Sequence, residues 1–148
     1  METIFQLSNL LVVPFWLLII LLPQWRQTQR IAASPFIVAP AALLYAALVL
    51  PALGSLLPLL ANPQLDSIAA LLGTPAGATI AWAHFLAFDL FAGRWAYLDS
   101  RQRGLSAWLV SPVLFLIFMV GPLGLLAYLL ARTLLRRSAP ALENPVAA

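Results

Sequence analysis

The sequence predicts an all-α integral membrane protein with four transmembrane helices in a small bundle. Of its 148 residues, 63% are hydrophobic and only 9% are charged, a composition that soluble domains do not show. The apolar residues form runs that approach or exceed the roughly 20 residues needed to cross a bilayer as a helix. They lack the strict alternation of a transmembrane β-strand. We expect one transmembrane domain over residues 1–137 and a disordered tail over 138–148.

The first span is expected from about Thr3 to Leu22. The segment "PQWRQTQR" follows it and supplies a tryptophan together with Arg26 and Arg30, which are side chains typical of the membrane interface. No basic segment precedes this run and no small-residue cleavage site follows it. The run is therefore interpreted as a retained span and not as a secretory signal peptide.

The second span is expected from about Phe36 to Leu57 and contains Pro40 and Pro51. Membrane helices tolerate proline because neighbouring groups can satisfy the freed backbone carbonyls. In the segment that follows, Asp66 and Ser67 resemble the start of a helix and precede a short apolar stretch. We therefore expect a surface loop with a brief interfacial helix.

The third span is expected over residues 75–95, with Tyr97 and the segment "DSRQRG" as a polar connector. The fourth is expected over residues 107–135, interrupted by "GPLG" at 121–124. Each half of the fourth run would be only about 21 Å long as a helix, too short for the ~30 Å hydrocarbon layer. A single helix that is tilted or kinked at GPLG is therefore favoured.

Several function classes are excluded by composition. The chain has no cysteine, which rules out disulfides, thiolate metal sites and iron–sulfur clusters. All eight basic residues are arginine, so there is no lysine for a Schiff base or a retinal attachment. The arginines lie at the ends of apolar runs, which indicates topology and anchoring signals and no nucleic-acid surface.

The arginines also give a predicted orientation. The positions that would share one side are Arg26, Arg30, Arg94, Arg101 and Arg103. The loop between the second and third spans contains no arginine, so the rule that cytoplasmic segments are basic places both termini away from the cytoplasm. The arginines at the end of the fourth span, which begin with Arg132, contradict this orientation.

Polar residues inside the third span are the candidates for function. On a helical wheel, one narrow aromatic stripe is formed by His84, Phe88, Phe91 and Trp95. Asp89 lies about 140° from His84, on a seam of small residues: Ala78, Ala81, Ala92, Gly93 and Ala96. Such seams allow close helix contact, so we expect Asp89 to face the first or fourth span, with GPLG as a matching surface.

Each candidate also has a structural interpretation. A carboxylate at this depth costs on the order of 2 kcal/mol to insert, so Asp89 is either functional or held by a tryptophan, a tyrosine, a freed backbone group or Arg94. His84 is either a site residue or an interhelical hydrogen-bond partner. Arg94 and Trp95 would equally suit an interfacial anchor pair. The phenylalanines are either packing residues or a surface for a flat polyene.

Two more features of this region have simple interpretations. The simplest interpretation of Asp99 with Arg101 and Arg103 is a solvated loop network. A lone histidine cannot define a zinc or haem site, so no metal site is predicted, although His84 could ligate one chlorophyll magnesium.

The string "AWAHFLAFDLFAGRWAYLDSR" and the later "SPVLFLIFMVGPLGLLAYLLAR" resemble the small membrane family of the plant abscisic-acid-deficiency protein, often called neoxanthin-synthase-like. The resemblance implies carotenoid metabolism, in particular isomerisation of an epoxide to the allene neoxanthin without a redox cofactor. That reaction needs an acid and a base in a dry pocket. By this resemblance, the catalytic candidates are Asp89, His84 and Arg94, and the polyene-binding candidates are His84, Phe88, Phe91 and Trp95.

Two other classes remain open. One is a non-enzymatic subunit that binds carotenoid or chlorophyll, associated with a photosystem or its assembly. The other is a small transport-like or scaffold protein with Asp89 as a proton-linked carboxylate. The expected partners are membrane lipid, a hydrophobic polyene and either a pigment–protein complex or further copies of the chain, with no nucleic acid. The expected location is a bacterial plasma membrane or a thylakoid membrane.

Overall fold

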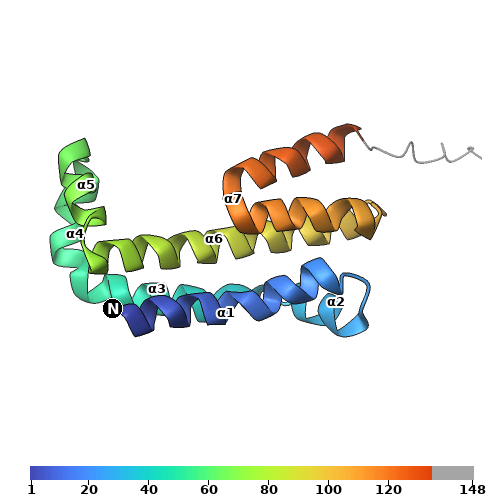
Figure 1. The fold of residues 1–148 in the computed structure, drawn as a ribbon, viewed down its shortest axis with the longest axis horizontal. Helices are drawn as coiled ribbons and strands as arrows, with labels where there is room; N and C mark the ends of the chain where they lie inside the picture. Colours follow the sequence, from blue (N-terminus) through green and yellow to red (C-terminus); the bar gives the residue numbers. More distant parts are fainter. Residues whose placement is uncertain (135–148) are drawn as a thin grey trace, which may run out of the picture.

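The structure is a computed structural model that describes residues 1–134, and the helices of this part leave only short connections. The α-helices are α1 (Glu2–Leu21), α2 (Arg26–Ala33), α3 (Ala39–Val49), α4 (Leu53–Ala61), α5 (Leu65–Leu72), α6 (Pro75–Gln102) and α7 (Ala107–Leu134), with 3-10 turns η1 (Pro35–Val38) and η2 (Leu50–Ala52). The proposed tail at 138–148 and the domain's last residues lie outside this range. Figure 1 shows α6 between α1 and α3 on one side and α7 on the other.

Four stretches of the described chain are long and apolar enough to cross a membrane: Glu2–Leu21, Pro35–Ala61, Pro75–Gln102 and Ala107–Leu134. They match the predicted spans closely at their starts. The second is a composite of η1, α3, η2 and α4. Its 3-10 turn at Leu50–Ala52 coincides with Pro51, which has no N–H to donate to an α-helical hydrogen bond.

Helix α6 is longer than predicted, and the connector expected at "DSRQRG" is wrong because α6 continues to Gln102. Thr74 caps the start of the helix, because its hydroxyl accepts a hydrogen bond from Gly77 N at 3.0 Å. It ends before Gly104, which has a φ of 64° that favours glycine. The short helix α5 confirms the brief helix expected after Asp66.

The core lies along α6. Trp16 of α1 is 1% exposed, and its ring lies against Gly93, where a Cβ would collide with it. The same ring packs on Phe118 of α7, with ring centroids 5.2 Å apart. The small-residue seam predicted on α6 therefore does admit another helix, as expected from the size of its residues.

Helix α7 reverses direction at GPLG. Val120 (φ −139°, ψ 32°) and Gly121 (φ 30°, ψ −95°) leave the helical conformation. Gly124 then lies against the backbone of Leu116 and Ile117, residues that would be a full two turns away in a straight helix. The predicted kink is confirmed, and the two halves fold side by side (Figure 1), so the single tilted or kinked helix that was expected is instead a hairpin.

This reversal changes the position of the C-terminal end of α7. Tyr128 and Arg132 contact Asp99 near the end of α6, the same end from which α7 starts. Phe5 near the N-terminus instead stacks on Trp82 near the start of α6, with centroids 5.5 Å apart. The N-terminus and the last described residues lie at opposite ends of the molecule (Figure 1), which does not fit the prediction of both termini on one side; the C-terminus itself lies outside the described residues.

Candidate functional site

His84 lies on the face of α6 that meets α3. Its ring stacks on Phe88 at 4.7 Å between centroids and meets the edge of Tyr45 from α3 at 5.2 Å. The neighbours of His84 are therefore aromatic rings from its own helix and from the second span. Within residues 1–134, no three His, Cys, Asp or Glu side chains gather closely enough to hold a metal ion.

Asp89 lies on another face of α6, at the tip of the α7 hairpin. A Cβ added to Gly121 would collide with the Asp89 carboxylate, coming within 3.2 Å of Oδ2 and closer to Oδ1. The expectation that Asp89 faces a seam with the fourth span at GPLG is therefore confirmed. Gly121 suits this position doubly, because its φ is positive and the carboxylate leaves no room for a side chain.

Arg94 turns away from Asp89 toward the end of α2. Its Nε donates hydrogen bonds to the carbonyls of Ala32 (2.8 Å) and Ser34 (3.2 Å), and its Nη2 donates to Ala33 (2.9 Å). Carbonyls at a helix C-terminus lack partners within the helix, and a guanidinium fork satisfies several of them together. The interpretation of Arg94 as an ion-pair partner of Asp89 is therefore wrong.

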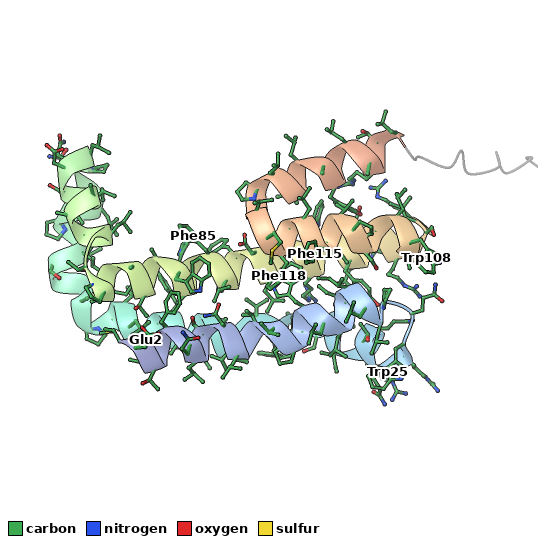
Figure 2. The ribbon with its side chains drawn as sticks, in the orientation of Figure 1. Glu2, Trp25, Phe85, Trp108, Phe115 and Phe118 are labelled. Atoms are coloured by element: carbon green, nitrogen blue, oxygen red, sulfur yellow. The ribbon has the colours of Figure 1, made fainter. Side chains whose placement is uncertain are left out.

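An exposed aromatic surface separates the two polar residues. Phe85 is 56% exposed and Phe88 is 62% exposed, and on the helix both lie in the arc between His84 and Asp89. In Figure 2, Phe85 projects from α6 on the side away from α1, beside the tip of α7. We call Phe85 and Phe88 the aromatic face; it has His84 at its α3 edge and Asp89 at its α7 edge.

The rest of the predicted aromatic stripe divides into two parts. Phe91 is 55% exposed and continues the apolar surface. Trp95 instead is covered by the second half of α7, where Tyr128 meets it edge-on at 5.6 Å and the Arg132 guanidinium lies 5.2 Å from its ring centroid. Trp95 therefore joins α6 to α7, and the four stripe residues do not form one continuous open surface.

A cluster of polar groups fastens the end of α6 to α7. The Asp99 carboxylate accepts a hydrogen bond from the Tyr128 hydroxyl at 2.6 Å and another from Arg103 Nε at 2.8 Å, and Arg132 Nε lies 3.4 Å away. Only 15% of the Asp99 side chain is exposed. The expected solvated loop network is therefore wrong, because Asp99 belongs to a helix and holds the returning half of α7.

Comparison with protein-family models shows to which family the chain belongs. The model of the family described as ABA DEFICIENT 4-like matches residues 3–128.

The chain belongs to the ABA DEFICIENT 4-like family.

Searches of curated proteins and of solved structures gave no match. The ABA DEFICIENT 4-like match spans α1 to the middle of the returning half of α7, so it includes the aromatic face, both polar residues at its edges and the hairpin tip. The resemblance inferred from the α6 and α7 strings is confirmed.

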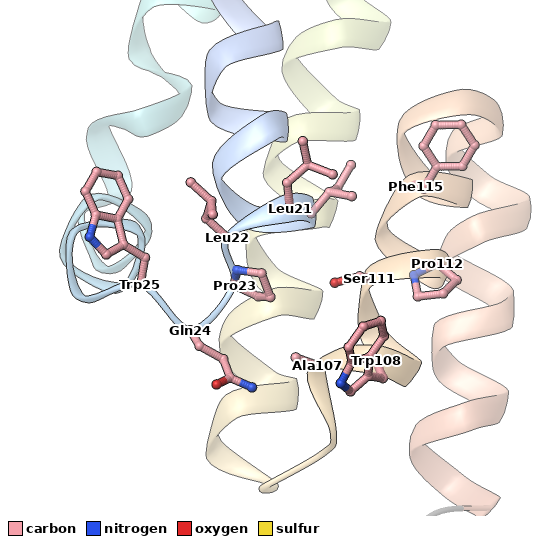
Figure 3. A pocket seen from close by; sticks show the side chains of 11 residues that line it. Leu21, Leu22, Pro23, Gln24, Trp25, Ala107, Trp108, Ser111, Pro112 and Phe115 are labelled. Atoms are coloured by element: carbon pink, nitrogen blue, oxygen red, sulfur yellow. The ribbon is translucent and has the colours of Figure 1, made fainter.

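The structure also contains a pocket that the sequence did not indicate. It has a volume of about 720 Å³ and lies between the end of α1, the following loop at Pro23–Trp25 and the first turns of α7 (Figure 3). Its walls come from segments more than 80 residues apart, which meet because α1 and α7 pack against α6 and against each other. The sequence signals the pocket only through Trp25, just after the first span, and Trp108, at the start of the fourth.

Proposed function

We propose that this chain acts on a carotenoid in the membrane, as an isomerase that converts an epoxide to an allene without a redox cofactor. Membership of the ABA DEFICIENT 4-like family supports the carotenoid assignment. The observation that carries the proposal is the aromatic face of α6, exposed between His84 and Asp89. A flat polyene end that lies across this face would have one ionisable side chain at each edge.

The geometry suits a reaction in which one proton leaves and another arrives. His84 and Asp89 are separated by a rise of about 7.5 Å along α6 and by about 140° around it. They cannot touch each other across the helix surface, but both can reach a ring that lies over Phe85 and Phe88. The separation of about 140° that prevents direct contact between His84 and Asp89 therefore favours an acid and a base on opposite sides of one substrate.

The proposed step balances without an oxidant or reductant. The base removes a proton from the polyene carbon next to the epoxide, and the C–H electron pair forms the second double bond of the allene. The epoxide C–O bond breaks toward oxygen, which takes a proton from the acid and becomes a hydroxyl. His84 and Asp89 supply these two functions, and exchange of protons with water after product release restores both. Arg94 acts as a positioning residue that holds α2 against α6.

The test is expression in a host that makes epoxidised carotenoids, with pigment profiles compared against an empty vector. We expect a new allenic product from the wild-type chain and none from Asp89→Asn. The asparagine amide keeps the shape of the carboxylate, but it can neither accept the proton from the polyene carbon nor donate one to the epoxide oxygen. Asp66→Asn on the separate helix α5 is the matched control and should retain product formation. Full product formation by Asp89→Asn in folded protein would remove Asp89 from the mechanism.

A pigment-binding subunit is the second candidate, favoured by the stack of His84 on the exposed Phe88 ring. It predicts stoichiometric pigment in the purified protein and no new product in the host. His84→Phe keeps an aromatic ring and removes the imidazole, so loss of bound chlorophyll from folded protein would indicate ligation of its magnesium. The proposal applies equally to a bacterial plasma membrane and to a thylakoid membrane.

A further inference from the structure

The pocket between α1 and α7 lies at the level of one membrane surface. The Tyr97 hydroxyl near the end of α6 donates a hydrogen bond of 2.7 Å to the Pro23 carbonyl in the pocket wall. Arg26 follows this wall in the chain, and Arg103 precedes the first turn of α7 that forms the opposite wall. Arginine and tryptophan at the ends of apolar helices mark the headgroup region. The pocket therefore opens where a membrane-embedded molecule would place its polar end.

The lining of the pocket combines a large apolar surface with a few neutral polar groups. The apolar walls include Leu21 and Phe115, and the indole of Trp108, itself 90% exposed, stands at the rim. Figure 3 shows the Ser111 hydroxyl pointing from α7 toward the loop that carries Pro23. All the described residues that line the pocket are uncharged.

Backbone geometry adds an acceptor to this wall. Pro112 has no N–H, so the carbonyl of Trp108, four residues earlier, lacks its usual helical donor. A hydroxyl group at this point could donate to that carbonyl and accept from Ser111. A phosphate would instead require cationic or multiple strong donors, which the lining does not supply.

We propose that this pocket binds the hydroxyl-bearing ring end of a carotenoid whose other end lies on the aromatic face. The inference rests on the proposed function, since it names the position of the non-reacting end of that substrate. The volume of about 720 Å³ is within the range of small-molecule sites. The indole and phenyl walls provide flat apolar surfaces for a ring and for the conjugated chain that leaves it.

The distance between the two sites requires an elongated ligand. Tyr97 marks the level of the pocket, and His84 lies about 20 Å from it along the axis of α6. A ligand that reaches both places must therefore be elongated, as a polyene with a ring at each end is. Binding of the remote end would orient the reacting ring and would select substrates that carry a ring hydroxyl.

Binding to the purified full-length chain in detergent tests this proposal. The probes are a C40 carotenoid with a hydroxyl on each ring and the parent C40 hydrocarbon, and quenching of tryptophan fluorescence reports binding. We expect Ser111→Ala to bind the hydroxylated probe about fivefold more weakly, the effect of one lost neutral hydrogen bond, and the hydrocarbon unchanged. Ser111→Leu should weaken both probes because it fills the pocket.

The matched control is Ser55→Ala, since the Ser55 hydroxyl donates to the Ala52 carbonyl of its own segment, far from the pocket. It should bind both probes as the wild type does. If Ser111→Ala and Ser111→Leu also bind both probes like wild type, the pocket is not the site, and the isomerase proposal stands on its own assay. Phospholipid retained by wild type and released by Ser111→Leu, with carotenoid binding unaltered, would likewise overturn the inference. A wild-type chain that binds neither probe would overturn both the inference and the proposed substrate.

Discussion

Replacement of Gly124 by alanine tests the reversal of α7 directly. In the folded hairpin, the new Cβ would lie about 2.5 Å from Ile117 Cα, where ordinary contact is 3.4–4 Å. The atoms it meets belong to the backbone and cannot rotate away, so the two halves of α7 must separate by roughly 1 Å. Such overpacking costs about 1–3 kcal/mol, while the higher helix propensity of alanine returns at most about 1 kcal/mol. Three backbone atoms crowd the new Cβ, which places the overpacking at the upper end of that range, so we expect a net loss of about 2 kcal/mol in the free energy of unfolding.

The assay is equilibrium unfolding of the purified chain in mixed micelles, followed by circular dichroism. Gly54→Ala is the matched control, because a Cβ at Gly54 in α4 would meet nothing within 4 Å. That variant should be as stable as wild type or more stable. If Gly124→Ala were stabilised to the same degree as Gly54→Ala, the two halves of α7 would not be in contact, and the hairpin would be refuted.

Two further predictions concern the arrangement of α7. Single cysteines at Gly104 and Leu134 should react with a membrane-impermeant reagent from the same side, and one at Asn62 should react from the opposite side. The labelling is specific because the parent chain has no cysteine. Labelling of Leu134→Cys and Asn62→Cys from one side would contradict the reversal. Tyr128→Phe should lower the free energy of unfolding by about 2 kcal/mol, because it removes a buried hydrogen bond to a carboxylate. Unchanged stability in the same micelle titration would show that this contact does not hold the returning half of α7.

The helices were predictable from the sequence because their apolar runs have the length that a bilayer requires. The ends of the spans were harder to predict than their starts. The polar segment after Trp95 resembles a loop by composition, yet α6 continues because Asp99 and Arg103 are four residues apart and pair along the helix. The polar helix α2 was missed because its pattern is short and it is stabilised by Arg94, which is distant in sequence.

Part of the candidate site was also predictable, because helix geometry fixes the angles between side chains. The wheel separates His84 from Asp89 correctly, since five residues of helix determine their angle whatever surrounds them. The partner of Asp89 at GPLG also followed from small residues and a proline. The exposed aromatic face and the pocket did not follow, because a wheel contains no information about which neighbouring helix stops short and leaves a surface open.

The direction of α7 resolves the conflict in the charge pattern. In the described chain, the arginines near the end from which α7 starts are Arg26, Arg30, Arg94, Arg101, Arg103 and Arg132. If α7 crossed the membrane once, Arg132 would lie on the other side, against the rule that basic residues share the cytoplasmic side. Because α7 returns, all six agree with that rule.

The reversal has a cost that explains the position of Asp89. A turn at membrane depth exposes backbone groups that hydrocarbon cannot satisfy, so it must be covered by protein. The non-helical residues Val120 and Gly121 are that turn, and Asp89 is the polar group placed against it. Asp89 therefore covers the turn with a polar group, and the proposed function gives the same carboxylate a second role as an acid or base. Asparagine keeps the size of the side chain and one oxygen beside the turn but cannot act as an acid or base, so Asp89→Asn separates these two roles, whereas an apolar replacement would remove both.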